Sequence, residues 1–170
     1  MGNSLDATRT IITQKTPLLL FSLLLLFLSG KTFAQLKIFD KNSLATIEKQ
    51  YTDQAFILVV WSIECLPCRE ELELISNIKK QYENINMVFL STDELAQKEM
   101  INSILKTYKL LNQDNWIFKK SNSPALKFAL DPNWYGELPR SYFYDSQHKR
   151  VGISGKLAKE NVLDWVDQIK

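Results

Sequence analysis

Residues 55–71 read AFILVVWSIECLPCREE, and this stretch decides the fold. Its first part, residues 55–62, is a continuous apolar run of strand length. A strand without a polar face is buried on both sides, which is typical of the centre of a sheet that helices cover. Cys65 and Cys68 follow at once, and behind them apolar residues recur at helical spacing. We therefore expect a buried strand, a Cys-Leu-Pro-Cys segment and an amphipathic helix in direct succession.

The patterns on both sides of this segment predict an α/β protein. Further strands are expected at residues 36–40 (an edge strand), 85–92, 140–145 and 151–154, the last two as a hairpin. Helices are expected at residues 43–51 with Ser43 as N-cap, at 66–83, 95–111 and 123–130, and at the C-terminus around Val162, Trp165 and Val166. No element is assigned to residues 112–120. The predicted sheet is parallel in its first part and antiparallel at the hairpin.

The composition excludes several classes of protein. The chain has 170 residues, of which 45% are hydrophobic, with 5 Gly and 5 Pro, so it is neither disordered nor collagenous. A net charge of +2 argues against nucleic acid as a partner, because such proteins show a clear basic excess. Two Cys and one His are one ligand short of a four-coordinate zinc site. We expect one domain, with no metal.

The N-terminus predicts export. Residues 17–28 (PLLLFSLLLLFL) form an uncharged apolar run behind a weakly basic stretch. The run is shorter than the roughly 20 residues that a membrane-spanning helix needs. Thr32 and Ala34 then fit a signal-peptidase site that leaves Gln35 first. Residues 1–34 are therefore expected to be a signal peptide, with an uncleaved membrane anchor as the alternative. Either way the expected location is the periplasm. No cysteine lies near the cleavage region, which excludes a lipoprotein anchor.

The spacing of Cys65 and Cys68 favours thiol–disulfide exchange. Cys65 is expected at the N-terminus of the helix, where backbone N–H groups and the helix dipole favour a thiolate. Cys68, one turn later, is close enough to close a small exchangeable ring. Pro67 is tolerated between them because an early helical position needs no N–H. Exchange requires this pairing of an exposed attacking thiolate with a resolving thiol, and outside the cytosol such a pair can be oxidised.

Other interpretations of the cysteines fit less well. A purely structural disulfide across two residues closes too small a loop to stabilise much. A zinc half-site needs two more ligands, and His148 is the one histidine in the chain. Covalent haem attachment needs a histidine directly after the second cysteine, where Arg69 stands. His148 itself is interpreted as a solvated loop residue. The Leu138-Pro139 bond, before the late strand, is either cis or an ordinary trans turn.

Residues 61–71 (WSIECLPCREE) resemble the active-site segment of thioredoxin-fold proteins, and most of all the exported TlpA/ResA/CcmG-like branch. The likeness extends over about residues 36–170. It implies that residues 35–170 form a thioredoxin-like domain, a central mixed β-sheet flanked by helices. It also implies that Cys65 is the attacking thiol and Cys68 the resolving thiol, with no cofactor beyond their redox-active disulfide.

The resemblance adds further site residues. Leu138-Pro139 matches the cis-proline loop, which in the family lies against the cysteines and offers its backbone to an extended substrate. Glu71, three residues after the second cysteine, matches an acid that the ResA-like branch uses near its cysteines. The predicted catalytic residues are thus Cys65, Cys68 and Glu71, and the predicted substrate-binding residues are Trp61, Leu66, Pro67, Leu138 and Pro139.

The sequence departs from the family pattern at several positions. Val59 stands where cytoplasmic thioredoxins have a buried Asp, which favours the exported branch. Glu64 replaces a common Trp, and Glu73 replaces the Pro that usually kinks the helix. Residues 131–135 (DPNWY), before the cis-proline loop, are more elaborate than in simple members. They are either a substrate-contacting insertion or packing around Trp134.

The local charge predicts a reductase. Glutamates surround the cysteines with Arg69 as the nearby cation, and carboxylates raise the cost of a thiolate. Strong oxidants stabilise the thiolate of their reduced form, and no histidine lies between Cys65 and Cys68 to do so. The expected substrates are disulfides of exported proteins or the thiols of apocytochrome c. The expected electron donor is a membrane thiol-transfer partner, and the protein is expected to be a monomer.

Two alternatives belong to other classes. The first is a thiol peroxidase-like redoxin, but such enzymes carry Thr three residues before the reactive cysteine, where this chain has Ser62. Peroxide consumption separates that alternative from a disulfide reductase. The second is a binding module for metal or haem assembly, with the cysteines as ligands. It requires tight metal binding by the reduced protein, which a single histidine disfavours.

Overall fold

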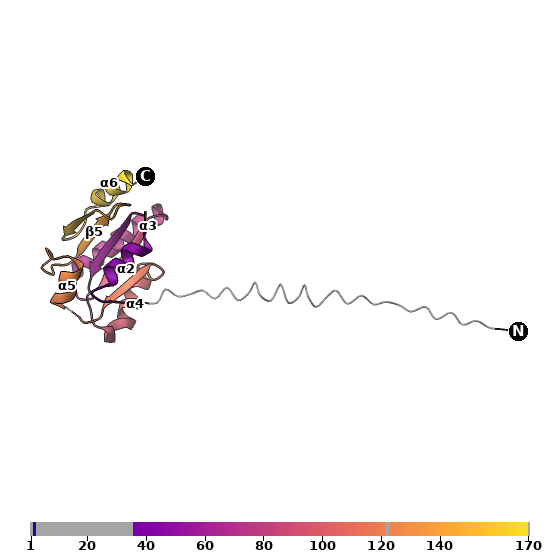
Figure 1. Cartoon of the computed structure of the whole chain (residues 1–170), viewed down its shortest axis with the longest axis horizontal. Helices are drawn as coiled ribbons and strands as arrows, with labels where there is room; N and C mark the ends of the chain where they lie inside the picture. The colour runs from indigo at the N-terminus through magenta and orange to yellow at the C-terminus, as the bar shows by residue number, and fades with distance from the viewer. Residues whose placement is uncertain (1, 3–35, 122, 170) are drawn as a thin grey trace. The chain divides into compact units, whose positions relative to one another are not determined.

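A computed structural model describes residue 2 and residues 36–121 and 123–169 of the chain (Figure 1). The predicted leader falls on residues that, Gly2 apart, lie outside this range. None of the helices in the described part has the length and apolar character that crossing a membrane demands.

Six strands form one mixed sheet in the order β1-β4-β3-β2-β5-β6. The pairs β1–β4, β4–β3 and β3–β2 are parallel, whereas β2–β5 and β5–β6 are antiparallel. The predicted α/β class and the mixed sheet are therefore confirmed. The strands are β1 (Lys37–Phe39), β2 (Phe56–Trp61), β3 (Asn86–Ser91), β4 (Asp114–Phe118), β5 (Arg140–Tyr144) and β6 (Arg150–Ser154).

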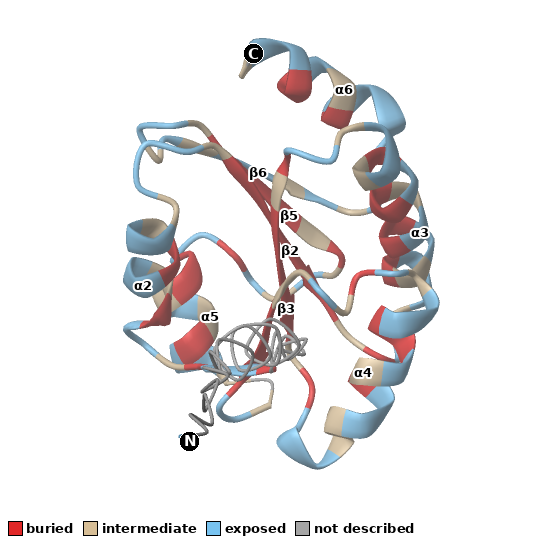
Figure 2. Ribbon diagram, turned by 90° about the vertical axis from the view of Figure 1, so that its right-hand side faces the viewer, coloured by how far each residue is buried: buried red, intermediate tan, exposed pale blue. Residues whose placement is uncertain are grey.

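Helices cover both faces of the sheet (Figure 2). α3, α4 and α6 lie on one side, and α2 and α5 lie on the other. The helices are α2 (Ser43–Gln50), α3 (Leu66–Gln81), α4 (Lys98–Thr107), α5 (Pro124–Leu130) and α6 (Lys159–Gln168), with a 3₁₀ turn η2 at Leu95–Gln97.

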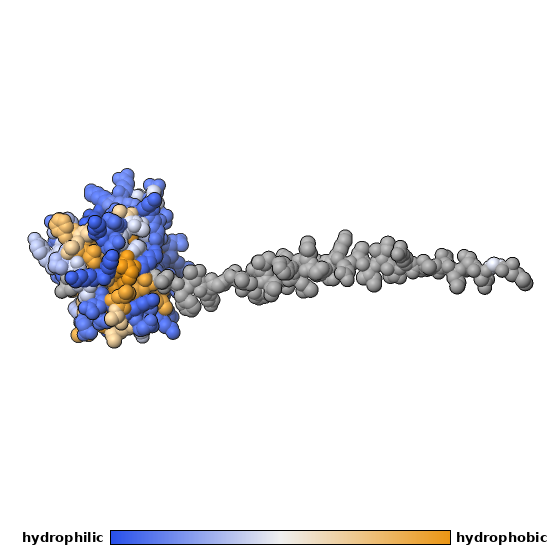
Figure 3. Space-filling model, turned by 60° about the horizontal axis from the view of Figure 1, so that its bottom comes forward, coloured by the Kyte–Doolittle hydropathy of each residue, from blue (hydrophilic) through white to orange (hydrophobic). Residues whose placement is uncertain are grey.

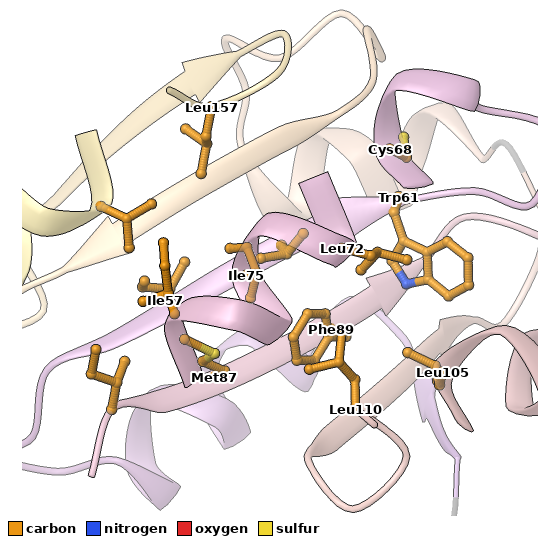
Figure 4. Packing of buried hydrophobic residues seen from close by; sticks show 14 of the residues in the cluster. Ile57, Trp61, Cys68, Leu72, Ile75, Met87, Phe89, Leu105, Leu110 and Leu157 are labelled. Carbon is orange, nitrogen blue, oxygen red and sulfur yellow. The ribbon is translucent and has the colours of Figure 1, made fainter. Parts of the chain in front are cut away.

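Strand β2 is central because both of its faces are apolar. All six of its residues are buried, as the continuous apolar run predicts. Ile57, Val59 and Trp61 point into the core under α3, and the alternate residues point into the core under α2 and α5. Figure 4 shows the first of these cores, where Ile57 and Trp61 pack with residues such as Leu72 of α3. The buried strand thus fixes the place where the cysteine segment begins.

The surface of the folded part is mostly polar on the side that Figure 3 shows, with hydrophobic residues gathered in one strip. Large hydrophobic side chains that are exposed in the described residues include Ile38, Leu66, Leu95, Met100, Phe128, Tyr135 and Val151.

Two elements differ from the prediction. Strand β4 has no counterpart there, because its first residues, Asp114 and Asn115, break the apolar pattern. Asn115 is nevertheless 2% exposed, since its amide donates to the carbonyl oxygens of Leu110 and Leu111. The helix predicted over residues 95–111 is shorter, with a separate 3₁₀ turn before α4. The chain leaves α4 at Thr107 and passes through Lys109, whose φ is +60°.

The two predicted helix starts with serine have different outcomes. Ser43 is not the N-cap of α2, because Asn42 holds that position. The Ser43 Oγ instead accepts a hydrogen bond from the Asp40 N–H at 2.8 Å. Ser123 is the N-cap of α5, and its Oγ accepts from the Leu126 N–H at 3.4 Å. The predicted helix with Pro124 at its first position is confirmed.

We expect Ser123→Ala to lower the free energy of unfolding by about 1 kcal/mol, because it leaves an N-terminal N–H of α5 without its side-chain acceptor. Urea denaturation of the purified protein measures this loss. Ser121→Ala, two residues before the cap, is the matched control and should leave the midpoint unchanged. Equal midpoints for both variants would contradict the capping role.

Candidate active site

Three segments of the chain meet at the end of the sheet where β2 and β3 finish and β5 begins. β2 and β3 are parallel, and their last residues, Trp61 and Ser91, are register partners. β5 runs the opposite way and begins beside them, with Arg140 opposite Val60. The segment after β2, the segment after β3 and the segment before β5 are therefore neighbours. The first of them contains the cysteines, and the last contains Leu138-Pro139.

Cys65 and Cys68 form a disulfide, with 5.2 Å between their Cα atoms. Cys65 is the N-cap of α3, and its Sγ accepts a hydrogen bond from the Cys68 N–H at 3.2 Å. Cys65 is half-buried, whereas Cys68 is 1% exposed. Leu66 between them is 77% exposed, and Pro67 is also exposed at the start of the helix. An incoming molecule can thus reach Cys65 and not Cys68, which is the asymmetry that thiol–disulfide exchange needs.

The Leu138-Pro139 peptide bond is cis. Of the two possibilities that the sequence leaves open, the cis form is the one found. Pro139 is buried, and Leu138 is partly buried against both hydrophobic cores. The Pro139 carbonyl oxygen accepts from the Gly155 N–H at 2.9 Å. Within the described residues the Leu138 backbone makes no such bond.

Glu71 is fully buried on α3, one helical turn after Cys68. Its Oε1 accepts from the Ser141 hydroxyl at 2.6 Å, and its Oε2 accepts from the Leu157 N–H at 2.8 Å. Burial raises the pKa of Glu71, and the two hydrogen bonds offset part of that rise. Both oxygens of Glu71 are therefore directed to Ser141 and Leu157.

No protein-family model matches the sequence, and no curated protein matches it. Solved structures do. The secreted disulfide oxidoreductase of Mycobacterium tuberculosis that is homologous to E. coli DsbE has a TM-score of 0.56 at 13% identity, over 71% of this chain and 85% of that chain. The thioredoxin family thiol:disulfide interchange protein of Chlorobium tepidum has a TM-score of 0.58 at 18% identity, over 72% and 83%. StoA of Bacillus subtilis has a TM-score of 0.51 at 17% identity, over 68% and 84%. This chain has the thioredoxin fold.

Trp61 lies beneath the site of this thioredoxin fold rather than on its surface. It is 1% exposed and packs in the core under α3, near Leu72 and below Cys68 in Figure 4. The predicted substrate contact at Trp61 is wrong, because its side chain points into the core under α3. The exposed residues Leu66 and Tyr135 come from the segments beside the cysteines, and they are 77% and 92% exposed.

The charged side chains near the disulfide differ in how far they are exposed to water. Glu70 pairs with Lys156 at 2.6 Å, and both side chains are more than half exposed. Water screens such a pair, so Glu70 has little effect on the cysteines. Arg69 donates to the carbonyl oxygen of Ile63 at 3.1 Å. Of the three glutamates that the sequence places near the pair, Glu71 is the one that is fully buried.

Asp93 is a buried carboxyl group that the sequence analysis missed. It follows β3 and is 8% exposed, and its Oδ2 accepts from the Ile63 N–H at 3.0 Å and from the Ser91 hydroxyl at 2.6 Å. Burial raises the pKa of Asp93, and the negative charge of Glu64 adds to the rise. A carboxylate directly after a strand parallel to β2 is the signal that could have located it.

The remaining candidates lie away from the cysteines or pack internally. His148 is half-buried, and its Nε2 lies 3.0 Å from the carbonyl oxygen of Tyr51 with its ring edge-on to Phe56, so it is not simply a solvated loop residue. Trp134 is 4% exposed and donates to the Glu137 carbonyl oxygen, which supports packing, whereas the adjacent Tyr135 is exposed. Over residues 36–121 and 123–169, no three acidic, Cys or His residues form a possible metal site.

Proposed function

We propose that this protein is an exported thiol-disulfide oxidoreductase that reduces protein disulfides. One observation carries the proposal: the Cys65–Cys68 disulfide caps the N-terminus of α3, with Cys65 reachable and Cys68 buried. The helix N-terminus favours the thiolate form of the capping cysteine. The thiol-disulfide oxidoreductases with the same fold support this assignment.

In the proposed reaction the reduced protein acts in two steps. The Cys65 thiolate attacks one sulfur of the substrate disulfide, so that a mixed disulfide forms and the other substrate sulfur leaves as a thiolate. The Cys68 thiolate then attacks the Cys65 Sγ and releases the second substrate sulfur. Two electrons and two protons pass from the two cysteines to the substrate, and the Cys65–Cys68 disulfide is formed.

The neighbouring backbone would hold the substrate. An extended segment can pair with the Leu138 backbone, as strand addition does at other sheet edges. Leu66, Pro67 and Tyr135 would meet the side chains on either side of the substrate cysteine. The substrate class is thus a disulfide in an accessible, extended part of another exported protein, which includes the oxidised cysteine pair of an apocytochrome c.

The reducing direction follows from charge. Glu71 is buried without a cation at ion-pair distance in the described residues, and its carboxylate makes a thiolate at the neighbouring Cys68 more costly. A protein that does not stabilise its thiolates holds its electrons weakly and is reducing. Its disulfide would be reduced again by a membrane thiol-transfer partner, and the dithiol is the only redox group that the proposal requires. We place the protein in the periplasm on the basis of the predicted leader, and we propose that it acts there as a monomer.

We expect the reduction potential of the Cys65–Cys68 pair to lie near that of thioredoxin, about −270 mV. Equilibration of the purified protein in dithiothreitol redox buffers, followed by thiol trapping, measures it. The Cys68→Ser variant provides the baseline without a disulfide. A value near about −120 mV would make the protein an oxidant and overturn the reductase assignment. The absence of a reversible couple would overturn the proposed function altogether.

A further inference from the structure

The backbone of Ile63, just before the cysteine segment, is held at its N–H and at its carbonyl oxygen by charged side chains. The Ile63 N–H donates to Asp93 Oδ2 at 3.0 Å, and the Ile63 carbonyl oxygen accepts from the Arg69 guanidinium at 3.1 Å. Hydrogen bonds with an ionised partner are about twice as strong as neutral ones. Ile63 is 3% exposed and precedes Cys65 by two residues.

Each of the two charged side chains is itself anchored to a regular element. The Ser91 hydroxyl donates to Asp93 Oδ2, and the Asp93 N–H donates to Ser91 Oγ at 3.0 Å, which ties Asp93 to the end of β3. Arg69 belongs to the first turn of α3. Ile63 is therefore clamped between the end of a strand and the start of the helix that Cys65 caps.

The segment between Ile63 and Cys65 has little freedom of its own. The Cys65 N–H donates to the Ser62 carbonyl oxygen at 3.3 Å, so residues 62–65 form a turn around Ile63. A shift of the Ile63 backbone would move this turn and change where the Cys65 sulfur lies. Catalytic geometry is sensitive to such movement, because a displacement of about 1 Å can lower a rate by about two orders of magnitude.

We propose that Asp93 and Arg69 form a pair of positioning residues that hold the backbone N–H and carbonyl oxygen of Ile63 and thereby aim Cys65 at its substrate. This inference rests on the proposed function. The pair carries one negative and one positive charge close to the reactive cysteine. A further charged group that interacts with Asp93 is Glu64, in the turn of residues 62–65.

The first test is the rate at which the full-length protein reduces insulin with dithiothreitol as electron source. We expect Asp93→Ala to lower the rate about tenfold, since it frees the turn that carries Cys65. Asp93→Asn keeps an acceptor oxygen for the Ile63 N–H and should restore most of the rate. Arg69→Ala and Arg69→Gln should behave in the same manner, because glutamine keeps an N–H donor.

The second test is the pH dependence of Cys65 alkylation by iodoacetamide, with Cys68→Ser as background so that one thiol reacts. Asp93→Asn removes a negative charge and should lower the pH midpoint, whereas Arg69→Gln removes a positive charge and should raise it, each by about 0.5 pH unit. Opposite shifts from two neutral, hydrogen-bonding variants are not expected from a loss of stability.

Asp114→Asn is the matched control. Asp114 is also a buried aspartate, with a 5% exposed side chain, but it begins β4 at the opposite end of the sheet. It should alter neither the rate nor the midpoint. Equal rates for the Ala and Asn variants of Asp93, or shifts of the two midpoints in the same direction, would overturn the proposal. Alkylation requires only a thiol, so it tests the pair even if the unaltered protein fails to reduce insulin, which would instead contradict the proposed function.

Discussion

Cys65→Ser removes the attacking thiol, and we expect the rate of insulin reduction to fall by about three orders of magnitude or more. The reason is the asymmetry of the pair. Cys68 is 1% exposed and cannot replace Cys65 in the attack on a bulky protein disulfide. The measurement is the turbidity of precipitating insulin chains, with the uncatalysed dithiothreitol reaction subtracted.

Cys68→Ser should have a different effect, because it leaves the first step intact and removes the second. The mixed disulfide between Cys65 and the substrate then accumulates. Non-reducing gels detect it as a band that disappears after treatment with dithiothreitol. The double variant with both serines is the control and should form no such band. Trapping by Cys65→Ser instead would mean that the roles of the two cysteines are reversed.

The local sequence is sufficient to predict a helix or strand that carries its own hydrophobic pattern. The apolar run at residues 55–62 and the helical spacing after Cys68 predict β2 and α3, because burial on both faces or on one stripe leaves a direct trace. Strand β4 left no such trace. Its Asp114 and Asn115 are stabilised by partners from elsewhere, among them Lys37 and the Leu110 carbonyl oxygen, so that polar residues sit at the start of a buried strand.

The residues of the site likewise divide into those that a local pattern predicts and those that depend on distant partners. The positions of Cys65 and Cys68 depend on one strand and one helix, and the sequence predicts them. Trp61 is among the predicted substrate-binding residues but is 1% exposed, and an apolar strand does not reveal which of its residues reach the site. The contact between Ile63 and Asp93 joins residues 30 positions apart, and that between Glu71 and Leu157 joins residues 86 apart. Only the sheet order brings these residues together, and no local pattern encodes it.

Glu71→Ala should have the largest effect on stability among the changes considered near the site. At pH 5 we expect a loss of about 2–3 kcal/mol in the free energy of unfolding, because the buried Leu157 N–H loses its acceptor and a cavity is left. Glu70→Ala is the matched control on the same helix. Glu70 is exposed, and its pair with Lys156 should contribute less than about 1 kcal/mol. Similar losses for the two variants would contradict the structural role of Glu71.

Glu71→Gln tests the charge itself through the pH dependence of stability. The folded-state pKa of Glu71 is raised above its ordinary value of 4.5, mainly by burial, so the folded protein binds this proton more tightly than the unfolded chain. The contribution is full below the unfolded-state pKa and is lost as the pH rises through the folded-state pKa. The wild type should therefore lose stability relative to Glu71→Gln between pH 4 and pH 8. Other groups cancel in this difference, and urea unfolding with the disulfide intact keeps the cysteines from titrating. A difference that stays constant over this range would mean that folding does not change the pKa of Glu71, which would contradict the rise caused by its burial.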